Sequence, residues 1–166
     1  MKILQTVLLI LFGIYITAQE NYVQINGNTN INSFKCTNNT FKTSTGTYTL
    51  NEKQLPNIAL KVEDFDCRNK IMTSDFQKTL SAEEYPYMTI KFISMDKAKT
   101  VYNAQIEVKM MNRSKTYNIT FCSENGKLTG KRIVKFSDFN IKPPKKMGGM
   151  IVVKDELNLV FALAAH

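Results

Sequence analysis

Side chains able to carry chemistry are few in this sequence, and their spacing excludes most reactions. The single histidine, His166, is the last of 166 residues, so a Ser-His-Asp or Cys-His catalytic set and any multi-histidine metal site are ruled out. Acidic residues such as Asp64, Asp66 and Asp75 lack the Asp-x-Asp-x-Asp-Gly spacing of a calcium loop. We therefore expect no catalytic residue, no metal and no cofactor, and hence a protein that is not an enzyme.

Residues 1–20 have the composition of a secretory signal peptide. Lys2 gives a short positive start, an apolar stretch covers residues 3–16, and the small residues Thr17 and Ala18 follow. A membrane-spanning helix needs roughly 20 apolar residues, which is more than this stretch supplies. We predict a signal peptide at 1–18, a mature domain at 19–166, and an exported protein that is periplasmic or secreted.

Export makes the three cysteines, Cys36, Cys67 and Cys122, candidates for oxidation. Two of them occur in similar fragments, Phe34-Lys35-Cys36 and Phe65-Asp66-Cys67, each with the cysteine two residues after a phenylalanine near a predicted strand end. This similarity favours a Cys36–Cys67 disulfide. The alternative is that all three are buried thiols that pack as small hydrophobic groups.

The chain is basic, with 22 Lys and Arg residues against 14 Asp and Glu residues and a net charge of +8. Lys142, Lys145 and Lys146 form one of the dense patches. Because the sequence has no nucleic-acid-binding motif, we expect weak contact with an anionic membrane surface and no nucleic acid. The alternative is a solvated surface whose lysines protect strand edges. The sequence is also compatible with a homodimer.

Period-two alternation of apolar and polar residues dominates the mature chain and predicts β-strands. The clearest example places Tyr102, Ala104, Ile106, Val108 and Met110 on one face of a strand. The dipeptide at 125–126 is Asn-Gly, a strong hairpin signal. Strands are predicted at 22–25, 28–36, 41–50, 57–64, 88–94, 102–110, 117–122, 127–137 and 157–163, with Gly27 easing a bend or turn.

One segment departs from this pattern and predicts a short helix at 73–81. Thr73 and Ser74 are suitable capping residues, Phe76 and Leu80 are spaced i, i+4, and Pro86 prevents continuation. About eight antiparallel strands with one short helix indicate an all-β fold. Closing the sheet would remove exposed edges, so a β-barrel is favoured over an open sandwich.

The interior of such a barrel is either filled by side chains or holds one small apolar ligand. Inward-facing positions on the predicted strands are apolar, which suits an apolar guest as well as a packed core. The candidate lining residues are Ile58, Leu60, Val62, Ile90, Phe92, Ile106, Val108 and Phe121.

Two blocks of sequence resemble the YceI-like family of secreted bacterial proteins. The first is Met72-Thr73-Ser74-Asp75-Phe76, followed by Leu80, Tyr85-Pro86 and the strand at 88–92, and it is similar to the family's "M-x-x-DF…L…YP-x-I-x-F" block. The second, from Leu128-Thr129-Gly130 to the "DF-x-I-x-PP" segment at 138–144, is similar to a late block of the same family. The resemblance implies a lipocalin-like antiparallel barrel that binds polyisoprenoids and other long amphiphiles.

The resemblance also implies a long apolar chain along the barrel axis, with an isoprenoid or isoprenoid quinone as the first expectation for the bound lipid. Burial of hydrocarbon is worth about 0.8 kcal/mol per CH₂, so such a chain has ample driving force. Residues expected at the mouth of the barrel are Phe76, Leu80, Tyr85 and Tyr87. The alternative function is that of a secreted structural or interaction protein with a filled barrel, which binds a protein or a membrane-surface partner.

Overall fold

A computed structural model describes residues 21–41 and 55–164 of the chain. The predicted signal peptide and, apart from Phe41, the predicted strand at 41–50 lie outside these residues. The helices within them are α1 (Lys70–Thr79) and the 3-10 helices η1 (Val62–Asp64), η2 (Phe136–Phe139) and η3 (Met147–Gly149). The strands are β1 (Tyr22–Thr29), β2 (Ser33–Asn38), β3 (Asn57–Lys61), β4 (Tyr87–Ala98), β5 (Val101–Met110), β6 (Arg113–Glu124), β7 (Lys127–Lys135), β8 (Lys145–Lys146) and β9 (Ile151–Ala164).

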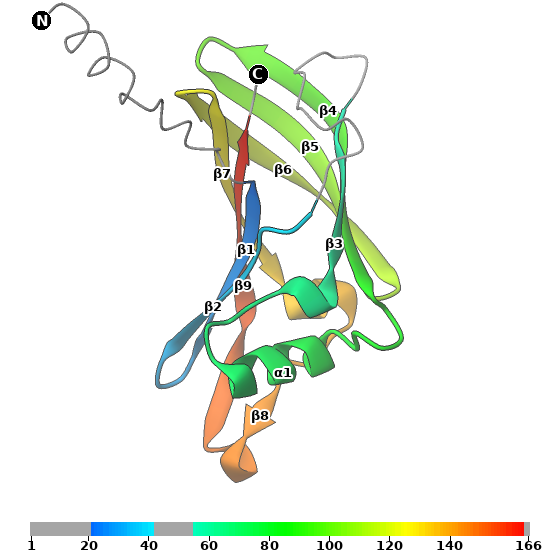
Figure 1. Ribbon diagram of the computed structural model, residues 1–166, viewed down its shortest axis with the longest axis vertical. Helices are drawn as coiled ribbons and strands as arrows, with labels where there is room; N and C mark the ends of the chain where they lie inside the picture. The colour runs from blue at the N-terminus through cyan, green and yellow to red at the C-terminus, as the bar shows by residue number, and fades with distance from the viewer. Residues whose placement is uncertain (1–20, 42–54, 165–166) are drawn as a thin grey trace, which may run out of the picture.

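One antiparallel sheet contains the long strands, in the order β2-β1-β9-β7-β6-β5-β4-β3 (Figure 1). The strands from β3 to β7 follow one another as neighbours, whereas β9 returns from the end of the chain to lie between β7 and β1. The short strand β8 pairs with the start of β9. The all-β antiparallel class and the short helix predicted from the sequence are confirmed.

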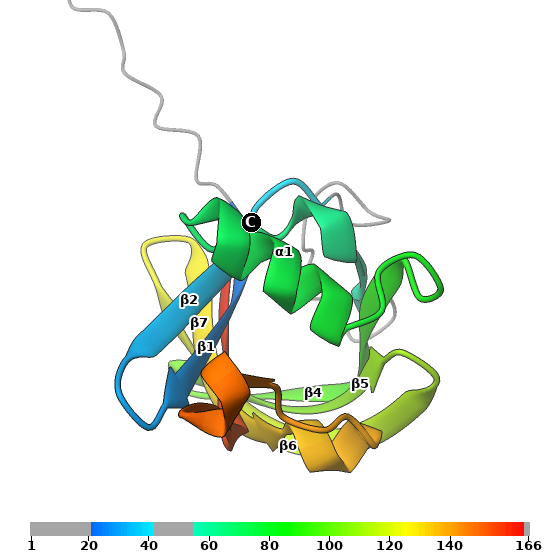
Figure 2. The same cartoon turned by 90° about the horizontal axis from the view of Figure 1, so that it is seen from below.

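The sheet curls into a half-barrel whose open side, between β2 and β3, is crossed by α1 (Figure 2). Among the described residues these two edge strands do not pair along their length. The edges are linked instead by a bridge between Thr37 and Asp66 and by a hydrogen bond of 3.0 Å from Asn38 Nδ2 to the Lys61 carbonyl. After β3 the chain enters η1 at Val62, and α1 begins at Lys70 after a short connection.

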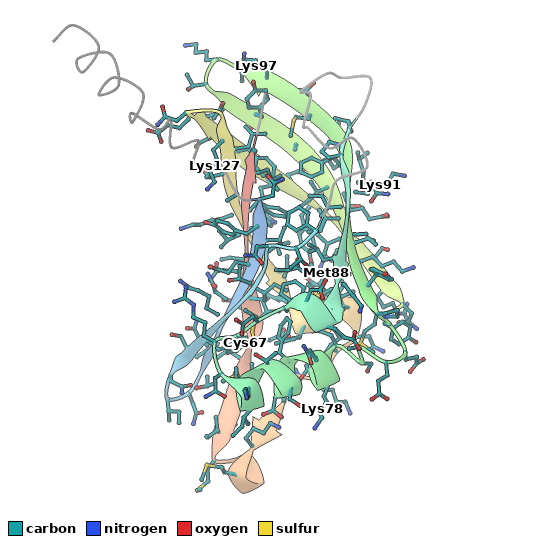
Figure 3. All side chains as sticks on the ribbon, in the orientation of Figure 1. Cys67, Lys78, Met88, Lys91, Lys97 and Lys127 are labelled. Atoms are coloured by element: carbon teal, nitrogen blue, oxygen red, sulfur yellow. A yellow bond between two sulfur atoms is a disulfide. The ribbon has the colours of Figure 1, made fainter. Side chains whose placement is uncertain are left out.

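The inner face of the sheet is apolar and buried. On β5, the residues from Tyr102 to Met110 are alternately buried and outward-facing, as the sequence predicts. The rings of Phe92 and Phe161 each lie 5.6 Å from the ring of Phe121. A Cβ at Gly130 would lie 2.7 Å from the Phe121 ring, so glycine lets the two strands approach there. In Figure 3, Met88 lies in the interior while Lys91, Lys97 and Lys127 lie at the periphery.

The helix α1 begins at Lys70, three residues before the predicted start. The Asn69 side chain accepts a hydrogen bond of 3.0 Å from the Met72 amide, which satisfies one of the free N–H groups of the first turn. Phe76 points into the core, with its ring 5.3 Å from that of Phe65. The cap and this aromatic contact fix the helix across the open side of the half-barrel.

The first hairpin differs from its prediction. A break near Gly27 was expected, but β1 continues to Thr29 and the turn lies at residues 30–32. Gly27 is paired with Phe34 inside the hairpin, and a Cβ there would lie 2.2 Å from the Phe34 ring. The glycine therefore serves to admit this ring over β1 rather than to turn the chain.

Candidate functional site

An apolar groove of about 360 Å³ lies at the end of the half-barrel that α1 covers. Its walls come from three parts of the chain that are distant in sequence: α1, the β1–β2 hairpin and the segment from η2 to β9. Figure 2 shows these elements around one end of the barrel. The volume falls within the range of about 300–1,000 Å³ that is usual for small-molecule sites. The residues that line the groove are Thr29, Asn32, Phe34, Ile71, Met72, Asp75, Phe76, Thr79, Phe136, Pro144, Lys146, Met147, Ile151 and Val153.

The helical wall follows from the spacing of residues along α1. Ile71, Met72, Asp75, Phe76 and Thr79 recur at one-turn intervals and therefore occupy one face of the helix. Phe76 is 5% exposed, whereas Ile71 at the start of the helix is 75% exposed. The wall thus grades from the packed core to an apolar rim in contact with solvent.

The hairpin wall is held rigidly by its turn. The Thr29 hydroxyl oxygen accepts hydrogen bonds from the amides of Ile31 (3.1 Å) and Asn32 (2.9 Å). Asn30 connects the turn to the start of β9, because its Nδ2 donates to the Met150 carbonyl at 2.9 Å and its Oδ1 accepts from the Val152 amide at 2.9 Å. Two walls of the groove are therefore fixed to each other by hydrogen bonds.

An ion pair spans the groove between the α1 wall and the wall formed by the segment from η2 to β9. Lys146 Nζ of β8 lies 2.7 Å from Asp75 Oδ1 of α1, and both side chains line the groove. A second pocket of about 380 Å³, with both polar and apolar lining residues, adjoins the groove and shares Asp75, Thr79, Pro144 and Lys146 with it. Lys78, which projects outward from α1 in Figure 3, and Lys142 also line this pocket. The arrangement suits a molecule with an apolar tail and a polar or anionic head.

A polar network supports the groove from the η2 side. The Asp138 carboxylate accepts hydrogen bonds from Lys115 Nζ, from the Tyr117 hydroxyl at 2.7 Å and from the Lys135 amide at 3.2 Å. Burial by itself would raise the pKa of Asp138, but the hydrogen bonds from Lys115 and Tyr117 outweigh it and lower that pKa. Burial, together with the hydrogen bond to Asp138, raises the pKa of Tyr117. The network anchors η2, which carries Phe136 into the groove wall.

Most residues proposed from the sequence as lining lie in the core behind the groove. Phe76 is the one member of the proposed set that lines the groove itself. Leu80, expected at the mouth, is 3% exposed and belongs to the core. The inward-facing residues that are likewise buried are Ile58, Leu60, Val62, Ile90, Phe92, Ile106, Val108 and Phe121.

The two tyrosines expected at the mouth are not part of the groove lining. Tyr85 is partly exposed in the loop before β4, and Tyr87 is 53% exposed. The reason is strand parity: Met88 points into the core, so its neighbour Tyr87 points outward. Apolar residues that the sequence reasoning missed, Ile71 and Met72, could have been found from Asn69, whose capping side chain extends the helix toward its N-terminus.

The disulfide pairs the two cysteines that the sequence favoured. Cys36 of β2 and Cys67, which precedes α1, form a disulfide that spans 31 residues, whereas Cys122 is free and exposed. The disulfide ties the edge of the sheet to the segment that leads into the helix. It therefore helps to hold α1 over the open side of the half-barrel.

Two further features bear on chemistry at the site. No cluster of three or more His, Cys, Asp or Glu side chains suited to a metal ion occurs among residues 21–41 and 55–164. In the same part of the chain, no helix has the length and apolar character needed to cross a membrane. The groove itself offers mainly apolar contacts, with lysine and aspartate side chains at its border.

Comparisons with known proteins agree with this fold. The family model described as YceI-like domain matches residues 16–165. BcnA from Burkholderia cenocepacia superposes with a TM-score of 0.67 at 16% identity, over 87% of this chain and 96% of that one. A YceI protein of Campylobacter jejuni gives a TM-score of 0.55 at 17% identity, over 68% of this chain and 71% of that one.

A third solved structure is a polyisoprenoid-binding domain from Saccharophagus degradans, implicated in plant cell wall breakdown. It gives a TM-score of 0.63 at 7% identity, over 88% of this chain and 94% of that domain. Among curated proteins, none matches the sequence. At these sequence identities the structural similarity establishes a shared fold. Membership of the family rests on the match to the family model.

Proposed function

The chain belongs to the YceI-like family, and we propose that it binds a long apolar molecule whose end occupies the groove beneath α1. The observation that carries this proposal is the apolar lining of the groove, in which Phe34, Met72 and Phe136 meet from three separate elements. Each CH₂ group that enters such an environment contributes about 0.8 kcal/mol. A hydrocarbon chain is the ligand that gains most from this lining.

The ligand class that fits best is an isoprenoid, as a polyisoprenoid or as the tail of an isoprenoid quinone. One supporting fact is that a domain of the same fold is a polyisoprenoid-binding domain. A second is the adjoining pocket, where the Lys78 and Lys142 side chains offer a place for the polar head of an amphiphile. Contact between the rest of the chain and the inner wall would require buried residues such as Ile90 and Val108 to move apart.

The proposed role is sequestration or transport without chemical conversion of the lipid. Apolar side chains make up most of the groove, and the charged pair within it, Asp75 and Lys146, is held together at 2.7 Å. Such a pair positions walls rather than activating a nucleophile. The proposal therefore assigns binding, and no reaction, to this site.

We also infer that the protein acts outside the cytoplasm, in the periplasm or as a secreted protein. The apolar stretch at 3–16 after Lys2 supports this inference, because it has the length and flanks of a signal peptide. The Cys36–Cys67 disulfide supports it too, because disulfides persist in oxidising compartments.

A titration with a fluorescent polyisoprenoid tests the proposed function. Wild-type protein should show saturable binding with one ligand per chain, and unlabelled polyisoprenoid should displace the probe. A Met72→Trp variant, which places an indole in the groove, should lose most of this binding, whereas Ile133→Trp on the outer face of β7 should not. Equal binding by both variants would show that the ligand site is elsewhere.

A further inference from the structure

Large apolar side chains that are exposed to solvent gather at the end of the molecule where the groove opens. Ile31 is 65% exposed, Ile71 75%, Met147 66% and Met150 67%. They come from the β1–β2 turn, the start of α1, and η3 with the residue after it. Ile71 and Met147 line the groove, and the hydrogen bonds of Asn30 hold the turn that carries Ile31 against Met150.

The backbone at η3 favours this exposure. Met147, Gly148 and Gly149 all have positive φ, at 51°, 65° and 96°. A methionine in the left-handed region is unusual and is worth a functional explanation. The tight turn directs two methionines, Met147 and Met150, outward from the tip of the β8–β9 segment, which projects beyond α1 in Figure 1.

Lysines surround these apolar side chains. Lys70 precedes Ile71, Lys145 and Lys146 precede Met147, and Lys142 lines the adjoining pocket. Asp75 pairs with Lys146, while Lys70, Lys142 and Lys145 form no ion pair within the described ranges. The end therefore combines apolar tips with a positive border, a composition that matches the interface of an anionic bilayer.

We propose that this end, defined by Ile31, Ile71, Met147 and Met150, docks onto the surface of an anionic lipid bilayer. In this orientation the apolar tips enter the region between head groups and acyl chains, and the lysines contact the anionic head groups. The groove then opens directly toward the bilayer, so an apolar chain passes between membrane and protein without crossing water. The docking rests on the surface itself, and its purpose in ligand exchange rests on the proposed function.

Vesicle flotation with purified protein tests the docking. Wild-type protein should float with phosphatidylcholine vesicles that contain about 30% phosphatidylglycerol, should bind pure phosphatidylcholine vesicles at least about tenfold more weakly, and should dissociate as salt increases. The Met147→Asp/Met150→Asp variant should lose about tenfold or more in vesicle affinity. Aspartate tolerates positive φ and both positions are exposed, so the fold should persist.

The matched control is Ile93→Asp/Ile133→Asp, which adds the same charge at exposed positions on the outer faces of β4 and β7. Its vesicle affinity should stay within about threefold of wild type. The two added negative charges lie away from the docking surface and weaken binding only through long-range repulsion. The proposal is overturned if both double variants bind equally, or if wild-type protein does not float. It is also overturned if wild-type protein is a dimer that the Met147→Asp/Met150→Asp variant dissociates, because a second copy then covers this face. Because Met147 lines the groove, polyisoprenoid titration of wild-type protein without vesicles reports the proposed function separately.

Discussion

Lys146 of β8 and Asp75 of α1 face each other across the groove, with 2.7 Å between Nζ and Oδ1. The two residues are 71 positions apart in the chain, and their side chains are 47% and 28% exposed. An ion pair that is exposed to this degree adds about 0–1 kcal/mol to stability. Its position between two walls of the groove matters more than that contribution.

The first prediction concerns this ion pair. Asp75→Asn should lower the free energy of unfolding by less than about 1 kcal/mol, but should increase the dissociation rate of a bound polyisoprenoid several-fold, because α1 and β8 can then separate. Stopped-flow displacement measures the rate. Lys61→Gln is a matched control, since it removes the Lys61–Glu63 ion pair, which does not line the groove. Equal rates for the two variants would contradict a role of the Asp75 pair in retention.

The second prediction separates a cavity from a filled core. Val108 is fully buried on the inner face of β5, whereas Ile133 is 53% exposed on β7. Val108→Trp should abolish polyisoprenoid retention if the chain extends along the inner wall, whereas overpacking a filled core would mainly destabilise the fold, by about 1–3 kcal/mol. Thermal unfolding and ligand titration of the same sample distinguish the two. Ile133→Trp should change neither.

The third prediction concerns the disulfide. Cys36→Ser/Cys67→Ser should lower the free energy of unfolding by about 2–4 kcal/mol, because the bridge closes a segment of 31 residues. Urea denaturation without reductant measures this. Cys122→Ser is the control and should change stability by less than about 0.5 kcal/mol, since Cys122 is free and exposed. A double variant as stable as wild type would show that the bridge does not hold α1 in place.

The fourth prediction follows from the lowered pKa of Asp138. A carboxyl group whose pKa is lower in the folded state stabilises the fold above its unfolded pKa, of about 3.9, and loses that contribution as pH falls through the folded pKa. Asp138→Asn should therefore cost about 1–2 kcal/mol at pH 7 and much less at pH 2. Chemical denaturation at both pH values measures the difference. A cost that does not depend on pH would mean that the charge of Asp138 is unimportant.

The strands of the sheet were predicted well from the sequence wherever one face of a strand is buried and the other is exposed. On β5, apolar and polar residues alternate from Tyr102 to Met110, and the apolar ones are the buried ones, because successive side chains point to opposite faces. Helix α1 was predicted with a late start because Asn69 was not considered as the capping residue. The inward-facing Met88 implies that Tyr87 points outward, whereas Tyr87 was predicted to line the mouth of the barrel.

The groove was not predictable in the same way. Its lining joins Phe34 of the first hairpin, Met72 of α1 and Val153 of β9, which meet through long-range packing that no local pattern records. The position of α1 depends likewise on where the chain passes after β3. The resemblance to the YceI-like family supplied the expected ligand class, whereas the residues that form the groove came from the structure.

Native mass spectrometry tests the central claim most directly. The protein is purified without detergent from the periplasm of an exporting bacterial host, weighed intact, and extracted with organic solvent. Lipid binding in the groove should give an added mass that matches an isoprenoid or isoprenoid quinone, lost in Met72→Trp and kept in Ile133→Trp. A bare protein mass, even after incubation with polyisoprenoids and quinones, would contradict it and would favour a filled barrel that acts through a partner.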